Sequence, residues 1–268
     1  MEINPYIFRN YDIRGIVGVD LDAEKVEVIG KAYGTFLQRR KIRQIVVGRD
    51  CRLSGKEYSD ALIKGVTSVG VDVIDLGIIM TQMMYFAQYR FQTNGGVMIT
   101  ASHNPWNFNG FKLAIGYSRT TETEDIDEIR KLTQDENFFK PERVGEARVL
   151  DDKAKEEFFS DYEKDVLKRV VLKKKFKVVI DGGMGTTGLF NPIIFRKAGC
   201  EVIEKNSIPD GHFPIGTPDP TGMEMMNRVR TAVLEEKADF GVAFDGDGDR
   251  IGIVDEKGNI LWNYVLVA

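Results

Sequence analysis

The stretch Phe240-Gly-Val-Ala-Phe-Asp-Gly-Asp-Gly-Asp-Arg250 joins an apolar run to three carboxylates at alternate positions. In an extended backbone alternate side chains point to the same side, so Asp245, Asp247 and Asp249 are predicted to converge. The intervening glycines let the chain curl without a Cβ clash. Such carboxylates repel unless a cation lies among them, hard divalent cations prefer oxygen ligands, and the neighbouring Arg250 suits a phosphate. The stretch therefore predicts a metal ion beside a phosphate group.

Two other structures fit parts of this stretch. An EF-hand loop beginning at Asp245 would place Glu256 at position 12, but position 6 is Arg250 instead of Gly. Its flanks, residues 240–244 and 251–254, also read as strands and not as helices. A solvated acidic turn between two strands needs one Asp-Gly pair, not three aspartates in register. The metal site is the favoured interpretation.

The composition bounds the class of protein. The chain has 268 residues, 43% hydrophobic and 29% charged, which indicates a soluble globular protein of about two domains. The net charge of −4 gives no basic field for nucleic acid. No signal peptide is visible, and no apolar run approaches the ~20 residues of a membrane span. Cys51 and Cys200 match no metal-binding spacing, which favours a reducing cytoplasm.

Helical and strand-like patterns alternate along the chain in two successive halves, which predicts two α/β domains with mostly parallel sheets. The expected helices are 24–39, 56–69, 80–91, 151–168, a helix ending at 197, and 223–237; the expected strands are 42–48, 71–76, 95–100, 111–115, 176–181, 201–204 and 239–244. Residues 8–15 are expected to form an arm that packs on a sheet. Ser54 and Glu57 form the pattern of a capping box.

A glycine-rich turn, Gly182-Gly-Met-Gly-Thr-Thr-Gly188, follows the strand expected at 176–181. Turns between a strand and a helix can hold phosphate through backbone N–H groups. This one matches neither the dinucleotide fingerprint nor the P-loop. Phosphate binding at this turn is therefore left open.

A second polar motif, Thr100-Ala-Ser-His-Asn-Pro105, ends a predicted strand, where open α/β sheets place ligands. Ser102 beside His103 could be an activated nucleophile, although adjacent residues in an extended chain point apart. No third member of a triad can be named from the sequence. Taken alone, the motif is typical of a turn with a solvent-facing serine.

Five motifs in one order change that interpretation, namely Tyr11-Asp-Ile-Arg-Gly15, Gly48-Arg-Asp50 with Arg52 and Ser54-Gly55, Thr100–Pro105, Asn109-Gly-Phe-Lys112, and Asp245–Arg250. With them the chain resembles the α-D-phosphohexomutases, and among these the phosphomannomutase/phosphoglucomutase branch. The phosphoglucosamine mutases instead carry Gly-Thr-Asp-Gly-Ile-Arg-Gly and Gly-Ile-Lys. The resemblance implies two successive three-layer α/β domains with mixed, mostly parallel sheets. They would comprise residues 1–150 and 151–259, with a third domain opening at 260–268.

The resemblance also implies roles for individual residues. Ser102 would carry a phosphoryl group, and His103 and Lys112 would be candidates for general acid and base. Arg14 and Arg250 would stabilise the transferring phosphoryl group, because it needs positive charge on its oxygens. One Mg²⁺ per chain would be held by an oxygen of the phosphoserine and by the three aspartates, Asp245, Asp247 and Asp249.

The implied reaction interconverts the 1- and 6-phosphates of mannose or glucose, with a hexose 1,6-bisphosphate as intermediate and activator. Family members have four domains, and the sugar-recognition and phosphate-anchoring loops of domains 3 and 4 are absent from this sequence. We therefore expect a fragment that is nearly inactive as a mutase. The alternatives are a non-catalytic metal- or phosphate-binding module, a metal-assisted phosphatase, and a phosphoglucosamine mutase.

The last residues, Trp262–Ala268, read as the first turns of a helix. Because the chain stops there with apolar residues, we expect residues 261–268 to fray or to associate with a second copy of the chain.

Overall fold

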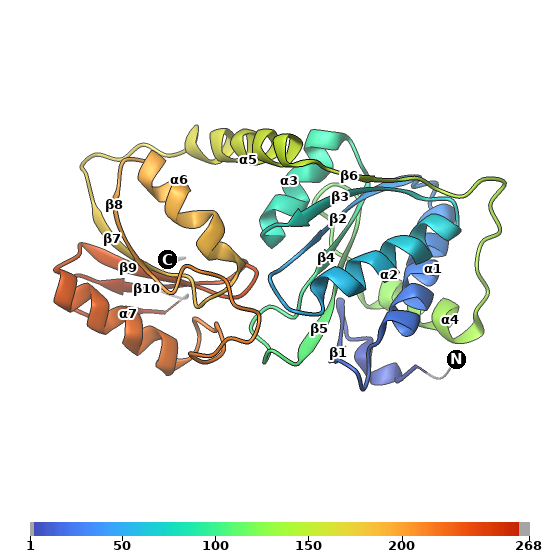
Figure 1. Cartoon of the computed structure of the whole chain (residues 1–268), viewed down its shortest axis with the longest axis horizontal. Coiled ribbons are helices and arrows are strands. Elements are labelled where there is room, and N and C mark those ends of the chain that lie inside the picture. The colour runs from blue at the N-terminus through green and yellow to red at the C-terminus, as the bar shows by residue number, and fades with distance from the viewer. Residues whose placement is uncertain (1–2, 263–268) are drawn as a thin grey trace. The chain divides into compact units, whose positions relative to one another are not determined.

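The computed structural model describes residues 3–262, and the chain divides into two compact units. The first unit comprises the chain up to Ala101 together with Asn107–Glu156. The second comprises Ser102–Trp106 and the chain from Glu157 onward. Each unit has its own β-sheet and its own helices (Figure 1).

The first unit contains a mixed six-stranded sheet in the order β1-β5-β4-β2-β3-β6. Strands β2, β3, β4 and β6 are parallel, whereas β5 runs antiparallel to both β4 and β1. The strands are β1 (Asp12–Ile16), β2 (Gln44–Arg49), β3 (Asp72–Ile78), β4 (Gly95–Ile99), β5 (Phe108–Ile115) and β6 (Ala147–Val149). The helices are α1 (Ala23–Arg39), α2 (Gly55–Ser68), α3 (Thr81–Phe91) and α4 (Thr123–Asp135), and a 3₁₀ turn covers Pro5–Ile7.

The period of two along the strands separates the faces of this sheet. Ile45 and Val47 of β2 belong to the buried cluster formed with α1, α2 and α4. Val46 lies between them and faces the other way, where a Cβ added at Gly96 would come 2.6 Å from Met84 of α3 and 3.2 Å from Val46. Helices therefore cover both faces, which confirms the three-layer α/β prediction for this unit.

Two local predictions for the first unit are wrong. Residues expected to form an arm contain β1, because Asp12–Ile16 pair along β5 from Lys112 to Phe108. Ser54 makes no side-chain cap on α2, and its Oγ instead accepts a hydrogen bond of 2.8 Å from Asn109 Nδ2. Tertiary partners thus replace the local partners that the sequence pattern indicated.

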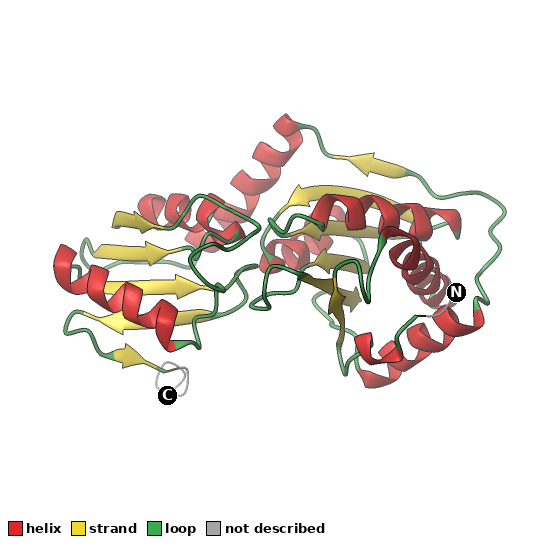
Figure 2. Ribbon diagram, turned by 60° about the horizontal axis from the view of Figure 1, so that its bottom comes forward, coloured by secondary structure: helices red, strands yellow, loops and turns green. Residues whose placement is uncertain are grey.

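The second unit contains a five-stranded mixed sheet in the order β11-β10-β9-β7-β8 (Figure 2). Strand β7 is parallel to β8 and β9, whereas β10 is antiparallel to β9 and β11. The strands are β7 (Lys177–Asp181), β8 (Glu201–Lys205), β9 (Phe240–Phe244), β10 (Ile251–Asp255) and β11 (Ile260–Leu261). The helices are α5 (Asp152–Leu167), which begins in the first unit, α6 (Asn191–Lys197) and α7 (Met223–Glu236), with a 3₁₀ turn at Thr186–Leu189.

Alternate residues of these strands again pack on opposite faces. Val179 and Ala243 belong to the cluster under α7, whereas Val178, Ile180 and Val242 belong to a second cluster that includes Phe195 of α6. The second unit is therefore also α/β with a mixed sheet, as predicted.

The end of the described chain pairs with the second sheet. Ile260 and Leu261 form β11 opposite Val254 and Ile253. The predicted helix start and the predicted self-association concern a tail whose residues 263–268 lie outside the described residues. The domain boundaries proposed from the sequence, at 150/151 and 259/260, stay predictions. Across residues 3–262, no helix is both long enough and apolar enough to cross a lipid bilayer.

Candidate functional site

The three aspartates lie in the tight connection between β9 and the antiparallel β10. Gly248 has a φ of +82°, and its N–H donates to the carbonyl of Asp245 at 3.2 Å. The strand flanks exclude an EF-hand, as expected. The extended alternation that we invoked is wrong, because a turn and not an extended chain brings the carboxylates together. The outcome is nevertheless a cluster, with one oxygen each of Asp245, Asp247 and Asp249 within 4.8 Å of one another.

Burial distinguishes this cluster from an ordinary acidic turn. The side chains of Asp245 and Asp247 are 0% exposed, and only Asp249 faces solvent. Two carboxylate charges within 4.8 Å of each other repel by at least about 3.5 kcal/mol at an effective dielectric constant of ~20. A solvated turn would not bury two of them. The donor set consists of hard oxygens at close range and fits a divalent cation such as Mg²⁺.

Ser102 lies directly against this cluster. Its Oγ donates a 2.5 Å hydrogen bond to Oδ2 of Asp245, while Oδ1 of Asp245 accepts the backbone N–H of Arg250 at 3.0 Å. Ser102 is 1% exposed, so the solvent-facing serine that the motif alone suggested is wrong. Its carboxylate neighbour orients the hydroxyl at the edge of the candidate metal site.

The backbone of Ser102 explains how it also meets His103. Ser102 has a φ of +54°, in the left-handed region that residues other than glycine rarely adopt. This bend brings Oγ within 3.3 Å of Nδ1 of His103, whereas an extended chain would have pointed the two side chains apart. Strain of this kind persists where the surrounding structure imposes it, commonly at functional sites.

Gly246 is required by the close approach of the aspartate turn to the serine. A Cβ built at Gly246 would lie 2.7 Å from the carbonyl oxygen of Ser102. No side chain fits at that distance without a backbone shift. The glycines of the motif therefore do more than relax the turn, because one of them allows Ser102 to reach Asp245.

The glycine-rich turn after β7 supports the aspartate turn and does not present free amides to a phosphate. The N–H of Thr186 donates to the carbonyl of Gly246 at 3.0 Å. The four preceding amides also donate within the protein, to the Lys205 carbonyl, an Asp181 carboxylate oxygen, the Asn206 carbonyl and the Gly182 carbonyl. The amides of residues 182–186 are therefore occupied within the protein, which argues against phosphate binding at them. These amides are used to hold the site in place.

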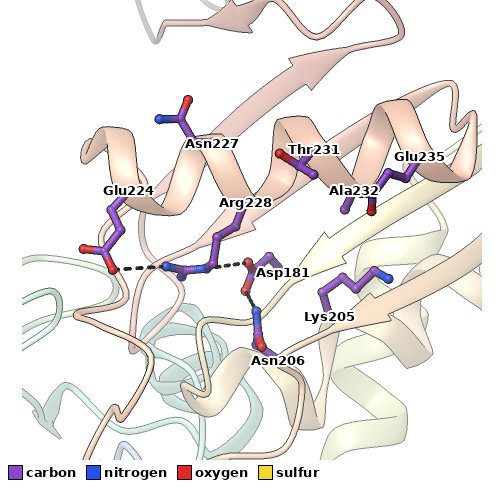
Figure 3. A pocket seen from close by; sticks show the side chains of 9 residues that line it. All are labelled: Asp181, Lys205, Asn206, Glu224, Asn227, Arg228, Thr231, Ala232 and Glu235. Carbon is purple, nitrogen blue, oxygen red and sulfur yellow. Dashed lines mark hydrogen bonds and ion pairs between the residues drawn. The ribbon is translucent and has the colours of Figure 1, made fainter.

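Asp181 holds the glycine-rich turn through Gly183, and Figure 3 shows it with its partners Asn206 and Arg228. This buried carboxylate accepts the N–H of Gly183 at 2.8 Å and Nδ2 of Asn206 at 3.1 Å, and Nε of Arg228 lies 3.5 Å away. Glu224 pairs with the same arginine at 3.8 Å. A cavity of about 470 Å³ lies beside these residues, between the ends of β7 and β8 and helix α7.

The remaining predicted site residues lie on both units. Arg14 on β1 is 6% exposed, with Nε 2.8 Å from Oδ2 of Asp12 and one η nitrogen donating to the carbonyl of Ala101 at 3.1 Å. It therefore holds the residue that precedes Ser102. Lys112 lies on β5 opposite Asp12 and Met98. Arg250 follows the aspartate turn with its side chain half-buried.

His212, the second of the two histidines in the chain, is hydrogen-bonded to Asp210. Its backbone N–H and its ring Nδ1 both lie 2.9 Å from Oδ1 of Asp210. The backbone hydrogen bond and then the ring hold the pKa of Asp210 below its usual range. The His212 ring lies 6.3 Å from the ring of Trp106 in the serine loop.

Local sequence patterns did not show that several charged residues of the first unit are buried. Asp12 holds Arg14, and Asp50 and Arg52 are almost fully buried in the loop after β2. Apart from the family motif that contains Asp50 and Arg52, the sequence showed a charged run at residues 49–52 directly after a β-branched strand. Nothing in that pattern separates a buried ion pair from a solvated loop.

Comparison with known proteins gives matches over both units. The family model described as phosphoglucomutase/phosphomannomutase, alpha/beta/alpha domain I matches residues 5–140, and that of domain II matches residues 156–258. A phosphomannomutase/phosphoglucomutase of Pseudomonas putida is 40% identical over 257 residues, covering 96% of this chain and 53% of that protein. A phosphoglucomutase/phosphomannomutase of Thermococcus kodakarensis is 38% identical, over 95% of this chain and 56% of its own length.

The solved structures agree with these relatives. A phosphoglucomutase/phosphomannomutase family protein of Burkholderia thailandensis superposes with a TM-score of 0.90 at 33% identity, covering 97% of this chain and 57% of that one. The chain thus spans about half the length of the curated relatives it matches.

Proposed function

We propose a function for this chain that proceeds from its family. The chain belongs to the phosphoglucomutase/phosphomannomutase family. Phosphorylated Ser102 gives its phosphoryl group to a hexose monophosphate, and the serine then takes a phosphoryl group back from the other position of the resulting bisphosphate. The overall reaction interconverts the 1- and 6-phosphates of mannose or glucose through a hexose 1,6-bisphosphate. The observation that carries the proposal is the buried Ser102 hydroxyl, 2.5 Å from Asp245 in a cluster of three carboxylates.

The residues divide the work of phosphoryl transfer. Asp245, Asp247, Asp249 and an oxygen on Ser102 would hold one Mg²⁺, which when bound offsets negative charge and polarises the serine oxygen. As Ser102 Oγ bonds to phosphorus, the bond from phosphorus to the sugar oxygen breaks. The serine proton passes to Asp245 or His103, both of which lie within hydrogen-bonding distance of its Oγ.

Positive charge on the transferring oxygens is the second requirement. Arg250 follows the aspartate turn directly and is proposed to supply it. Arg14 is proposed to add charge while its hydrogen bond fixes the Ala101 carbonyl. Lys112 is proposed to exchange a proton with a sugar hydroxyl. A cytoplasmic location remains part of the proposal on the sequence alone.

Incubation of the chain with glucose 1,6-bisphosphate and Mg²⁺, followed by intact-mass and peptide-mass analysis, tests this function. We expect one phosphoryl group on Ser102 and none in Ser102→Ala. Parallel reactions with mannose 1,6-bisphosphate and a glucosamine bisphosphate rank the sugars. Phosphate released steadily into solution without a phosphosugar product would indicate a phosphatase. Mg²⁺ binding without any labelling of Ser102 would contradict the transfer function and leave a binding module.

A further inference from the structure

We propose that Asp50, Arg52 and Thr100 form a clamp that positions the serine loop for phosphoryl transfer. This inference rests on the proposed function, because it assigns these residues to the step at Ser102. Their contacts include the two ends of the loop, at Thr100 and Phe108. They act as positioning residues through the two ends of the loop.

The clamp is a buried ion pair that holds both ends of the loop. The side chains of Asp50 and Arg52 are 1% and 0% exposed, with Nε of Arg52 3.1 Å from Oδ2 of Asp50. The same Oδ2 accepts the hydroxyl of Thr100 at 2.7 Å, two residues before Ser102. An η nitrogen of Arg52 donates to the Phe108 carbonyl at 2.9 Å, where the loop ends. One charged pair therefore connects the residues on either side of the loop.

The sheet explains why a clamp is needed at this position. The β4–β5 ladder ends at the pair Ile99 and Phe111, although β5 starts three residues earlier at Phe108. On its other edge β5 stays paired with β1 as far as Phe108. The Thr100 N–H donates to the Gly110 carbonyl, and beyond that bond the two chains separate. Arg52 donates to the Phe108 carbonyl, which β4 no longer pairs with. The loop therefore leaves the sheet at two held residues, Thr100 and Phe108.

Burial of two charges argues against a role in stability alone. Removing an ion pair from water costs more than an apolar pair of similar size would, so a buried pair is weak evidence for stabilisation. The polar contacts on Asp50 are instead directional, and its Oδ1 also accepts the backbone N–H of Arg52 at 2.9 Å. Such a fixed geometry matches the demand of a step in which a displacement of ~1 Å can cost ~100-fold in rate.

Thr100 gives a matched pair of variants that leaves both charges in place. Thr100→Val removes the hydroxyl that Asp50 accepts, whereas Thr100→Ser keeps it. At saturating glucose 1,6-bisphosphate we expect the rate of Ser102 phosphorylation to fall about tenfold or more in Thr100→Val, within the range that loop misplacement produces. The half-saturating bisphosphate concentration and the Mg²⁺ affinity should stay within about twofold, because the aspartates are untouched. Thr100→Ser should retain the wild-type rate.

Amide hydrogen exchange supplies a readout that does not need the reaction. We expect faster exchange at residues 101–107 in Thr100→Val than in Thr100→Ser, with the remaining sheet amides unchanged. Equal exchange in the two variants would overturn the clamp, as would equal phosphorylation rates. If wild-type chain takes no phosphoryl group, the proposed function fails, and the exchange comparison alone still decides whether the clamp holds the loop. A slower exchange or a uniform loss of protection in Thr100→Val would also count against it.

Discussion

Asp247→Asn should change metal affinity and metal-free stability in opposite directions. Asp247 is fully buried, and its ligand oxygen lies within 4.8 Å of those of Asp245 and Asp249. Within that distance the repulsion between the two buried carboxylates, Asp245 and Asp247, is at least about 3.5 kcal/mol with an effective dielectric constant of ~20. Removing one charge relieves this repulsion, and we expect ~1–3 kcal/mol of it to appear as greater metal-free stability after solvent and relaxation are allowed for. The same change removes one anionic ligand and should weaken Mg²⁺ binding at least about tenfold.

Thermal unfolding with and without Mg²⁺, together with titration calorimetry, measures both effects. The metal-free variant should melt at a higher temperature than wild type, and added Mg²⁺ should raise its midpoint much less. Asp249→Asn is the matched control, because Asp249 is exposed. It should weaken Mg²⁺ binding with little effect on metal-free stability. An Asp247→Asn chain with wild-type Mg²⁺ affinity would refute the reasoning, and a loss of metal-free stability would refute the repulsion argument.

Three further changes give outcomes that differ in kind. Gly246→Ala places a Cβ 2.7 Å from the Ser102 carbonyl oxygen, ~0.6 Å closer than a usual C–H···O contact. It should lower the free energy of unfolding in urea by ~1–3 kcal/mol and slow the phosphorylation of Ser102. Wild-type values for both would contradict the close approach. The hydrogen bond from Arg143 lowers the pKa of Asp72, so this carboxylate stabilises the fold above its unfolded pKa of ~3.9 and loses that contribution as pH falls through the lower folded pKa. Asp72→Asn should therefore be less stable than wild type at pH 7 and approach it below about pH 4, and a pH-independent difference would argue against the pair. Asp181→Ala removes the acceptor of the Gly183 N–H and should loosen the glycine-rich turn that supports the aspartate turn. Calorimetry should therefore show weaker Mg²⁺ binding, and an unchanged affinity would mean that this turn does not hold the site.

Periodic apolar patterns were enough to predict most of the fold. Helices and strands with long amphipathic or β-branched runs, such as α1 and β2, lie where the sequence places them. Strand β1 was missed because Asp12–Ile16 contains two charges and a glycine, and only its pairing with β5 makes it a strand. Strand β6 was missed because its three residues, Ala147–Val149, are all exposed and too few to show a strand pattern.

The residue types of the site could be predicted from the sequence, but their geometry could not. Three aspartates separated by glycines were enough to predict a carboxylate cluster, but not the turn that forms it. Ser102 and Asp245 are 143 residues apart, so no local pattern could show their hydrogen bond. The left-handed conformation of Ser102 was equally hidden, because serine itself has no preference for it. The family resemblance brought these residues together before the structure did.

The buried residues Asp50 and Arg52 show what local reasoning misses. In the sequence they form a charged loop, and charged loops are usually solvated. Their burial depends on Thr100 and Phe108, which lie about fifty residues further along the chain. A polar residue becomes part of a core only when tertiary partners satisfy it.

The central claim is that Ser102 and the three carboxylates form a single site for a metal and a phosphoryl group. The most direct test is a Mg²⁺ titration of two forms of the chain, with Ser102 phosphorylated and unphosphorylated, at the same ionic strength. A phosphoryl group adds ~1.5–2 negative charges beside Asp245, so the phosphorylated chain should bind Mg²⁺ more tightly, and Asp247→Asn should weaken binding in both forms. Equal or weaker Mg²⁺ affinity in the phosphorylated chain would contradict the claim.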